Sequence, residues 1–239
     1  MSESPASRRD ELASRLRDVR RDVDEAAARA GRGGDEVRLI VVTKTWPVGD
    51  VRLLSSLGVT EVGENRHQEC RTKVEALAGL PVRWHFIGQV QSNKAAAIAA
   101  YADSVHSVDS VRVARRLDAG ARQHQREVEC FVQVSLDPDE ETRARRGGLT
   151  SDDLLGVAEA VEEAAGLRLR GVMGVPPRHG DAQAAYRQLR VLSERLQHRF
   201  SHAAAISAGM SGDFADAIVE GATHVRVGSA VLGQRPALR

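Results

Sequence analysis

The sequence has 239 residues, of which 42% are apolar and 28% charged, and its 34 basic and 33 acidic side chains leave a net charge of +1. These values are typical of a soluble globular chain and exclude the collagen-like, disordered and disulfide-framework classes. Without a basic stripe or an apolar run of about 18 residues, neither nucleic acid nor a membrane is expected as a partner. Two cysteines sixty positions apart and a polar N-terminus without a secretory signal favour a cytoplasmic protein.

The first expected element is a helix over residues 6–30. Its apolar residues recur at steps of three and four, which places them on one helical face, and glycines follow it at positions 31, 33 and 34. The apolar residues of this face are Leu12, Leu16, Val19 and Val23.

After this helix, short apolar segments alternate with helical ones. Strands are expected at residues 37–43, 61–65, 84–88, 104–108, 128–136, 167–175, 203–207 and 224–227. Helices are expected at 47–57, 66–78, 93–101, 110–123, 151–165, 181–199 and 212–220. Eight strands separated by helices predict an α/β fold of the (β/α)₈ TIM-barrel type, with an open doubly wound sheet as the alternative. No break in composition suggests a second domain, so residues 1–239 are expected to form one barrel domain, with the helix over 6–30 outside it.

In such a barrel the strand ends and the loops after them build the functional site. Only three of the 34 basic residues are lysines, at positions 44, 73 and 94, and Lys44 ends the first strand. Lys44 alternates with Ile40 and Val42 and should share their inward face. Apolar surroundings lower the pKa of an amine, as Schiff-base formation with an aldehyde requires. The alternative is a lysine paired with a carboxylate such as Glu64, and the spacing does not decide between the two.

The last two strands end in small polar residues that suggest a phosphate site. Residues 207–212 form a small-residue turn before a short helix, and Gly228-Ser229 makes a second tight turn. Backbone N–H groups there and the Ser211 hydroxyl could bind an anion; the alternative is that the glycines serve only the turns and Ser211 is an N-cap. Arg226 alternates with His224 and should point inward, either to pair with a carboxylate or to donate to a ligand's ring nitrogen or phosphate.

These motifs form an ordered set that covers nearly the whole chain. The set closely resembles the pyridoxal phosphate homeostasis proteins, which are single-domain barrels similar to the N-terminal domain of alanine racemase. The motifs are Thr43-Lys44-Thr45, Gly63-Glu64-Asn65, Trp84-His85-Phe86-Ile87-Gly88, Gln91-Ser92-Asn93-Lys94, Gly171-Val172-Met173, Ser207-Ala208-Gly209-Met210-Ser211 with Asp213, and Arg226-Val227-Gly228.

The resemblance implies pyridoxal 5′-phosphate as the cofactor, held as a Schiff base on Lys44. It implies Arg226 at the pyridine nitrogen, Asn65 beside the ring and His85 nearby. The phosphate would be surrounded by Ser207, Met210, Ser211, Gly228 and Ser229.

The sequence departs from the family pattern at three positions. Thr43 stands where serine is usual, Trp46 occupies a position that is often basic, and Arg146 replaces the lysine of a Lys-x-Gly motif. The arginine-rich segment 143–146 is expected to be a solvated loop with at most a weak anion contact.

The resemblance implies a non-catalytic protein of intracellular vitamin B6 homeostasis that supplies the cofactor to apo-enzymes, with no catalytic and no metal-binding residue. An arginine at the pyridine nitrogen weakens the electron sink that carbanion chemistry needs, which agrees with this role.

The first alternative is an amino-acid racemase, which needs an acid/base group on each face of its substrate. In alanine racemase one such group is a tyrosine of a second domain; this chain stops at Arg239, and Tyr101 and Tyr186 fall on predicted helices. The second alternative is a barrel for another phosphorylated metabolite, with Lys44 serving only as a charge. A monomer is expected.

Overall fold

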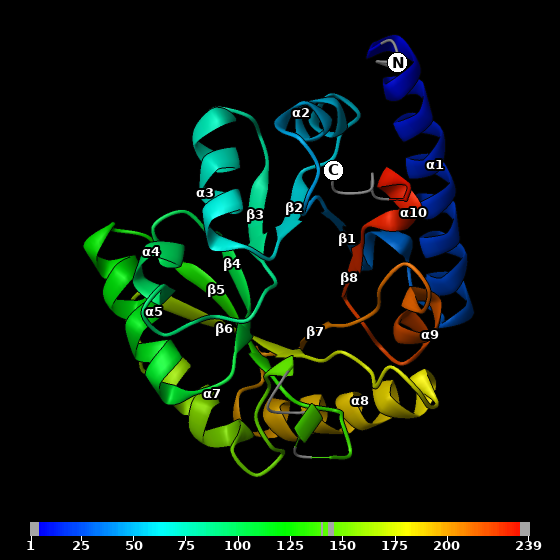
Figure 1. Cartoon of the computed structure of the whole chain (residues 1–239). Coiled ribbons are helices and arrows are strands. Elements are labelled where there is room, and N and C mark those ends of the chain that lie inside the picture. The colour runs from blue at the N-terminus through cyan, green and yellow to red at the C-terminus, as the bar shows by residue number, and fades with distance from the viewer. Residues whose placement is uncertain (1–4, 140, 143–145, 235–239) are drawn as a thin grey trace.

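The computed structural model describes residues 5–139, 141–142 and 146–234, and its strands close into a parallel barrel (Figure 1). The strands follow one another in chain order, and β1 pairs with both β2 and β8. This closure confirms the (β/α)₈ prediction and excludes the open doubly wound sheet. The strands are β1 (Arg38–Val42), β2 (Glu61–Glu64), β3 (Arg83–Phe86), β4 (Ser104–Val108), β5 (Val128–Gln133), β6 (Leu167–Met173), β7 (Ala205–Ser207) and β8 (His224–Val227).

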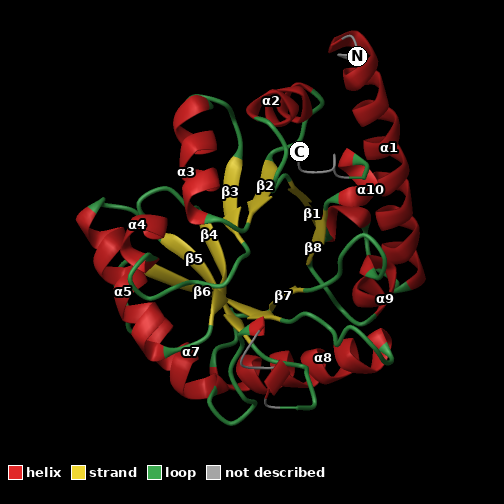
Figure 2. Ribbon diagram, in the orientation of Figure 1, coloured by secondary structure: helices red, strands yellow, loops and turns green. Residues whose placement is uncertain are grey.

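Helices surround the barrel on its outer face (Figure 2). Several elements are shorter than predicted; the fifth strand, expected to reach residue 136, ends at Gln133, after which Val134 donates to the Met173 carbonyl of the sixth strand and forms an isolated bridge with Leu149. The helices are α1 (Pro5–Arg29), the 3-10 helix η1 (Gly34–Glu36), α2 (Val48–Ser56), α3 (His67–Ala76), α4 (Ala95–Ala99), α5 (Val111–Gln123), α7 (Leu154–Glu162), α8 (Ala182–Arg199), α9 (Phe214–Val219) and α10 (Ser229–Leu232).

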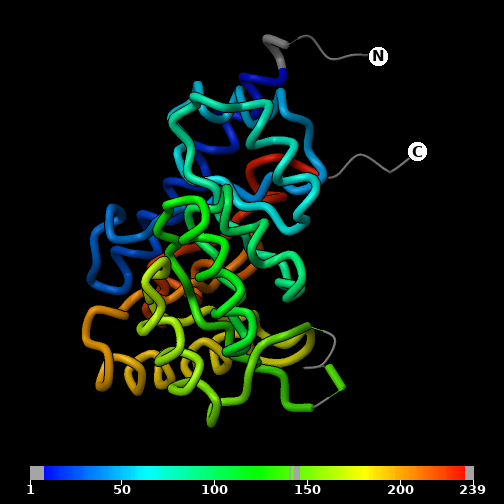
Figure 3. The backbone as a smooth tube through the Cα atoms, turned by 90° about the vertical axis from the view of Figure 1, so that its left-hand side faces the viewer, coloured from blue at the N-terminus to red at the C-terminus, as the bar shows by residue number. Residues whose placement is uncertain are grey.

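Helix α1 lies along the outside of the barrel beside α9 and α10 (Figures 1 and 3). The apolar face predicted from the sequence is buried there, with Leu12 and Leu16 almost fully covered. Arg8 fixes the N-terminal end of α1, since its guanidinium pairs with Asp50 of α2 at 3.0 Å and lies 4.8 Å from the Trp46 ring. Among the described residues, no helix has the length and apolar character needed to cross a membrane.

Residues alternate along each strand between the barrel interior and the layer under the helices. Val41 belongs to the apolar layer between strands and helices, whereas Ile40 and Val42 face the interior. Gly63 of β2 gives those side chains room, because a Cβ there would lie 3.0 Å from Ile40 and 3.4 Å from Val42. Lys44 continues the inward series of β1, as the sequence predicts.

Charged side chains line the N-terminal rim of the barrel. Arg83 of β3 pairs with Glu129 of β5 at 2.9 Å, and Arg38 of β1 pairs with Glu61 of β2 at 3.4 Å. Arg170 of β6 approaches Glu129 at 3.6 Å. These partly exposed pairs contribute little stability individually. They bring the Glu61 carboxylate to the N-terminal end of the interior.

Candidate functional site

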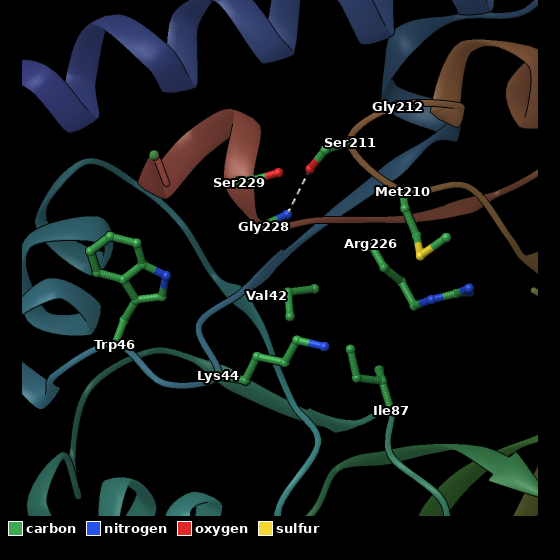
Figure 4. Close-up of a pocket in the computed structure, with 11 residues that line it drawn as sticks. Val42, Lys44, Trp46, Ile87, Met210, Ser211, Gly212, Arg226, Gly228 and Ser229 are labelled. Carbon is green, nitrogen blue, oxygen red and sulfur yellow. Dashed lines mark hydrogen bonds between the residues drawn. The ribbon is translucent and has the colours of Figure 1, made fainter. Parts of the chain in front are cut away.

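A pocket of about 270 Å³ opens at the C-terminal mouth of the barrel (Figure 4). Its volume is slightly below the range of about 300–1,000 Å³ found for small-molecule sites. Six of the nine predicted site residues line it: Lys44, Met210, Ser211, Arg226, Gly228 and Ser229. Its other lining residues, not predicted from the sequence, are Val42, Trp46, Ile87, Gly212 and Gly233.

Lys44 is half-buried and extends into the pocket toward Ile87 and Arg226 (Figure 4). The backbone turns sharply after it, because Thr45 has a left-handed φ of 68°. For a residue with a Cβ this conformation costs roughly 1–2 kcal/mol. The Thr45 N–H donates to Glu69 Oε1 at 2.5 Å, which holds the turn in place.

A buried cluster holds the backbone on both sides of Lys44. Lys73 donates to the Thr43 carbonyl at 2.8 Å, to Glu64 Oε1 at 2.7 Å and to Glu69 Oε1 at 2.8 Å. The Thr43 hydroxyl donates to Glu64 Oε1 at 2.6 Å. We call Thr43, Glu64, Glu69 and Lys73 the Lys73 cluster. The Lys73 cluster fixes the backbone segment that carries Lys44. Lys73 therefore supports the pocket without lining it.

The position of Glu64 bears on the alternative in which it pairs with Lys44. Lys44 follows the inward residues of β1, whereas Glu64 points from β2 toward α3, where Lys73 binds it. Burial raises the pKa of Glu64, and the hydrogen bonds from Lys73 and Thr43 oppose that rise. The structure therefore places this carboxylate with Lys73, on the face of the sheet opposite the pocket.

The turn after β7 is fixed by its own backbone and by β8. Gly209 has φ 91°, and a Cβ there would lie 2.8 Å from the Phe214 Cα, so only glycine fits. The Met210 N–H donates to Asp213 at 2.6 Å, and the Arg226 N–H donates to the Gly209 carbonyl at 2.9 Å. These contacts hold Met210 at the pocket.

Ser211 joins the two loops that were predicted to bind phosphate. Its hydroxyl accepts hydrogen bonds from the N–H groups of Gly228 at 3.2 Å and Ala230 at 3.3 Å. Ser211 therefore caps the start of α10 rather than that of its own helix α9, so the N-cap alternative is only partly right. Figure 4 shows the hydroxyls of Ser211 and Ser229 beside the Gly228 amide; the amide donates to Ser211, and the two hydroxyls are donors able to hold an anion.

Arg226 points inward, as its alternation in β8 predicts, and is 5% exposed. It donates to Ser207 Oγ at 2.6 Å and to the Gly174 carbonyl at 3.1 Å, both neutral acceptors rather than the carboxylate that the sequence left open. Burial lowers the pKa of Arg226 to about 10, so the guanidinium still carries its charge at neutral pH. A buried cation therefore faces the pocket.

Three predicted site residues lie outside the lining of this pocket. Ser207 is buried beneath it, with its hydroxyl on Arg226 and His106. His85 lies deeper in the barrel, between His106 and Glu61. Asn65 lines a neighbouring pocket formed by the loops after β2 and β3.

The positions where the chain departs from the family pattern have local contacts. Trp46 lines the pocket beneath the Arg8 guanidinium. Arg146 pairs with Asp137 at 2.6 Å and donates to the Pro176 carbonyl, which ties down the loop after β5. The rest of the predicted arginine-rich loop, residues 143–145, lies outside the described residues.

Comparison with known proteins gives the class of this barrel. Residues 15–236 match the family described as alanine racemase, N-terminal domain, and the chain belongs to that family. A solved alanine racemase of Clostridium difficile is 14% identical with a TM-score of 0.75, covering 95% of this chain and 58% of its own. At that identity the likeness shows the fold.

Within this class the chain belongs to the pyridoxal phosphate homeostasis protein family, which confirms the resemblance of the motifs. The relative so named in Corynebacterium glutamicum is 40% identical over 222 residues, covering 90% of this chain and 97% of its own. The Escherichia coli K12 relative is 34% identical over 231 residues, covering 94% and 97%. PipY of Synechococcus elongatus, solved with PLP bound, is 32% identical with a TM-score of 0.80 and covers 93% of this chain and 100% of its own.

Proposed function

We propose that the chain binds pyridoxal 5′-phosphate in the pocket at the barrel mouth. The Lys44 amine would attack the aldehyde carbon and, with loss of water, form an imine that holds the ligand reversibly. The observation that supports this best is the convergence of an amine, a buried cation and a group of anion donors in one pocket. The PLP-bound structure of PipY adds support from a relative.

The residues of the pocket suggest how the ligand would lie. Ser211, Gly228 and Ser229, with Met210 beside them, would hold the phosphate, and Arg226 would donate to the ring nitrogen. Ser207 and His85 would then act through Arg226, since both are buried behind the pocket lining. The placement of Asn65 beside the ring stays a prediction.

The pocket lining supports a role without catalysis. Racemisation needs an acid/base group on each face of the substrate. Of the described residues that line the pocket, Lys44 is the one with a titratable amine, and none is Tyr, His, Cys, Asp or Glu. Tyr101 and Tyr186 are buried and line no part of this pocket, although Tyr186 interacts with Arg226 and Asp213 behind it. We therefore propose a non-catalytic protein that keeps free aldehyde low and supplies pyridoxal phosphate to apo-enzymes; the cytoplasmic location and the monomeric state stay predictions.

Borohydride trapping tests the proposed function directly. Pyridoxal 5′-phosphate added to the purified protein should give a violet-absorbing band, and reduction followed by peptide mapping should locate the adduct on Lys44. Lys73 and Lys94 serve as internal controls and should remain unmodified. An unchanged spectrum with no adduct, or labelling spread over all three lysines, would refute the proposal.

The Ser211→Ala variant tests the proposed phosphate site. The alanine removes one of the two hydroxyl donors proposed to hold the phosphate, so affinity for pyridoxal 5′-phosphate should fall about tenfold, the scale of one hydrogen bond to a charged group. Affinity for pyridoxal, which has no phosphate, should hardly change. Equal losses for both ligands in equilibrium titrations would place the phosphate elsewhere.

A further inference from the structure

A continuous series of hydrogen bonds runs through the barrel from the charged N-terminal rim to the pocket. Glu61 Oε2 lies 2.5 Å from His85 Nε2, and His85 Nδ1 lies 2.9 Å from His106 Nε2. His106 Nδ1 lies 2.7 Å from Ser207 Oγ, which accepts from Arg226 Nη1 at 2.6 Å. We call these five residues the interior relay. They come from five different strands.

The middle of the interior relay has little or no contact with solvent. His106 and Ser207 are fully buried and His85 is 1% exposed. The His106 ring stacks on Phe131 at a centroid distance of 4.4 Å. Buried polar groups of this kind destabilise a fold unless each one is hydrogen-bonded, and here each is bonded to the next.

The two ends of the relay, a guanidinium that can only donate and a carboxylate that accepts, fit a single direction for all its bonds when both histidines are neutral. Ser207 Oγ then accepts from Arg226, and its own hydrogen goes to His106 Nδ1. His106 then carries its proton on Nε2 and donates to His85 Nδ1. His85 carries its proton on Nε2 and donates to the Glu61 carboxylate.

Other features of the interior favour this arrangement with an uncharged His106. Burial, together with the positive charge of Arg226, holds the pKa of His106 well below its usual range. The opposite tautomer of His106 would donate to Ser207, whose oxygen already accepts from Arg226. The serine hydrogen would then lose the acceptor that His106 Nδ1 provides.

We propose that His106 is a positioning residue, which acts with Ser207, His85 and Glu61 to orient Arg226 toward the ring nitrogen of the bound ligand. This inference rests on the proposed function for the identity of the ligand. In the relay the Nη1 group of Arg226 donates to Ser207 Oγ, and its Nη2 group donates to the Gly174 carbonyl. Partners behind a ligand-binding side chain commonly fix its orientation in this way, and their loss weakens binding without any direct contact.

Two phenylalanine variants and two ligands test the relay. His106→Phe keeps a ring against Phe131 but removes both nitrogens. His224→Phe is the matched control, since His224 also packs on Phe131, at 5.1 Å, and lies edge-on to His106 at 6.3 Å, but its Nδ1 bonds to Thr223 outside the relay. The ligands are pyridoxal 5′-phosphate and its 1-deaza analogue, which has carbon in place of the ring nitrogen.

His106→Phe should weaken pyridoxal 5′-phosphate about tenfold, the scale of one hydrogen bond to a charged group, and leave affinity for the 1-deaza analogue unchanged. His224→Phe should change neither affinity. Equal losses for both ligands in His106→Phe, or the same pattern in His224→Phe, would show a merely structural role and overturn the inference.

The tautomers of His85 and His106 can be measured in the unmutated protein, so the inference stays testable even if His106→Phe does not fold. Nitrogen NMR of histidine-labelled protein should show protons on Nε2 of both His85 and His106. A proton on His106 Nδ1 would overturn the relay. If the unmutated protein binds neither ligand, the proposed function fails, while the tautomer measurement still decides whether the relay exists.

Discussion

The Lys73→Met variant should lose about 3–5 kcal/mol of the free energy of unfolding, the cost of removing one partner from a buried ion pair. Lys73 is 3% exposed, and it donates to Glu64, which is fully buried. Glu64 Oε2 has no hydrogen-bond partner, so Oε1 alone receives the bonds from Lys73 and Thr43. Without Lys73, a carboxylate would remain in the apolar layer with one hydroxyl donor.

This loss should depend on pH in a defined direction. Burial raises the pKa of Glu64 above its unfolded value, and without Lys73 the rise is larger. Over the range between the unfolded and the folded pKa, the folded state therefore binds more protons than the unfolded state. Stability then falls as the pH rises through that range. Lys73→Met should accordingly lose more stability near pH 8 than near pH 5.

Urea denaturation at both pH values measures these effects. Lys94→Met is the control, because Lys94 is exposed and its replacement should change stability by less than about 0.5 kcal/mol. Adding Glu64→Gln to Lys73→Met should recover part of the loss, since it removes the stranded charge. A loss no larger than that of the control would show that the Lys73 cluster does not stabilise this end of β1.

The Lys44→Arg variant should bind pyridoxal 5′-phosphate at least about a hundredfold more weakly, a difference of about 2.7 kcal/mol. Arginine keeps the positive charge in the pocket, but a guanidinium does not form the stable imine that the proposed function requires. The violet absorbance should disappear together with the affinity. Both are followed in one equilibrium titration.

Lys94→Arg makes the same chemical change outside the pocket and should bind normally. Retained affinity in Lys44→Arg would favour the alternative of a barrel for another phosphorylated metabolite, with Lys44 serving as a charge. Turnover of amino acids that is present in the unmutated protein and lost in Lys44→Ala would instead favour a racemase.

Local sequence patterns were sufficient for the architecture and for much of the pocket. Alternation along β1 and β8 correctly set Lys44 and Arg226 facing inward, because strand geometry fixes which face each residue occupies. The turns after β7 and β8 were recognisable from their small residues. They meet at the pocket because neighbouring parallel strands end at the same edge of the barrel.

The same patterns did not separate residues that line the pocket from residues buried behind it. Ser207 ends β7 as Lys44 follows β1, yet its hydroxyl turns inward to Arg226 and His106. No local pattern marks His106, because it stands in an ordinary strand and its hydrogen-bond partner Ser207 is 101 positions away. Trp46 and Ile87 likewise become pocket residues only when the loops after β1 and β3 meet.

The sequence by itself determined the order of the strands and helices, the inward faces of β1 and β8, and the family. These features depend on periodicity and on short motifs, which are local properties of the chain. Only the tertiary structure decided that Lys73 rather than Lys44 binds Glu64, that Ser211 caps α10, and that five strands each supply one residue of the interior relay. Hydrogen bonds between residues far apart in the chain depend on barrel closure and strand register, which no local pattern specifies.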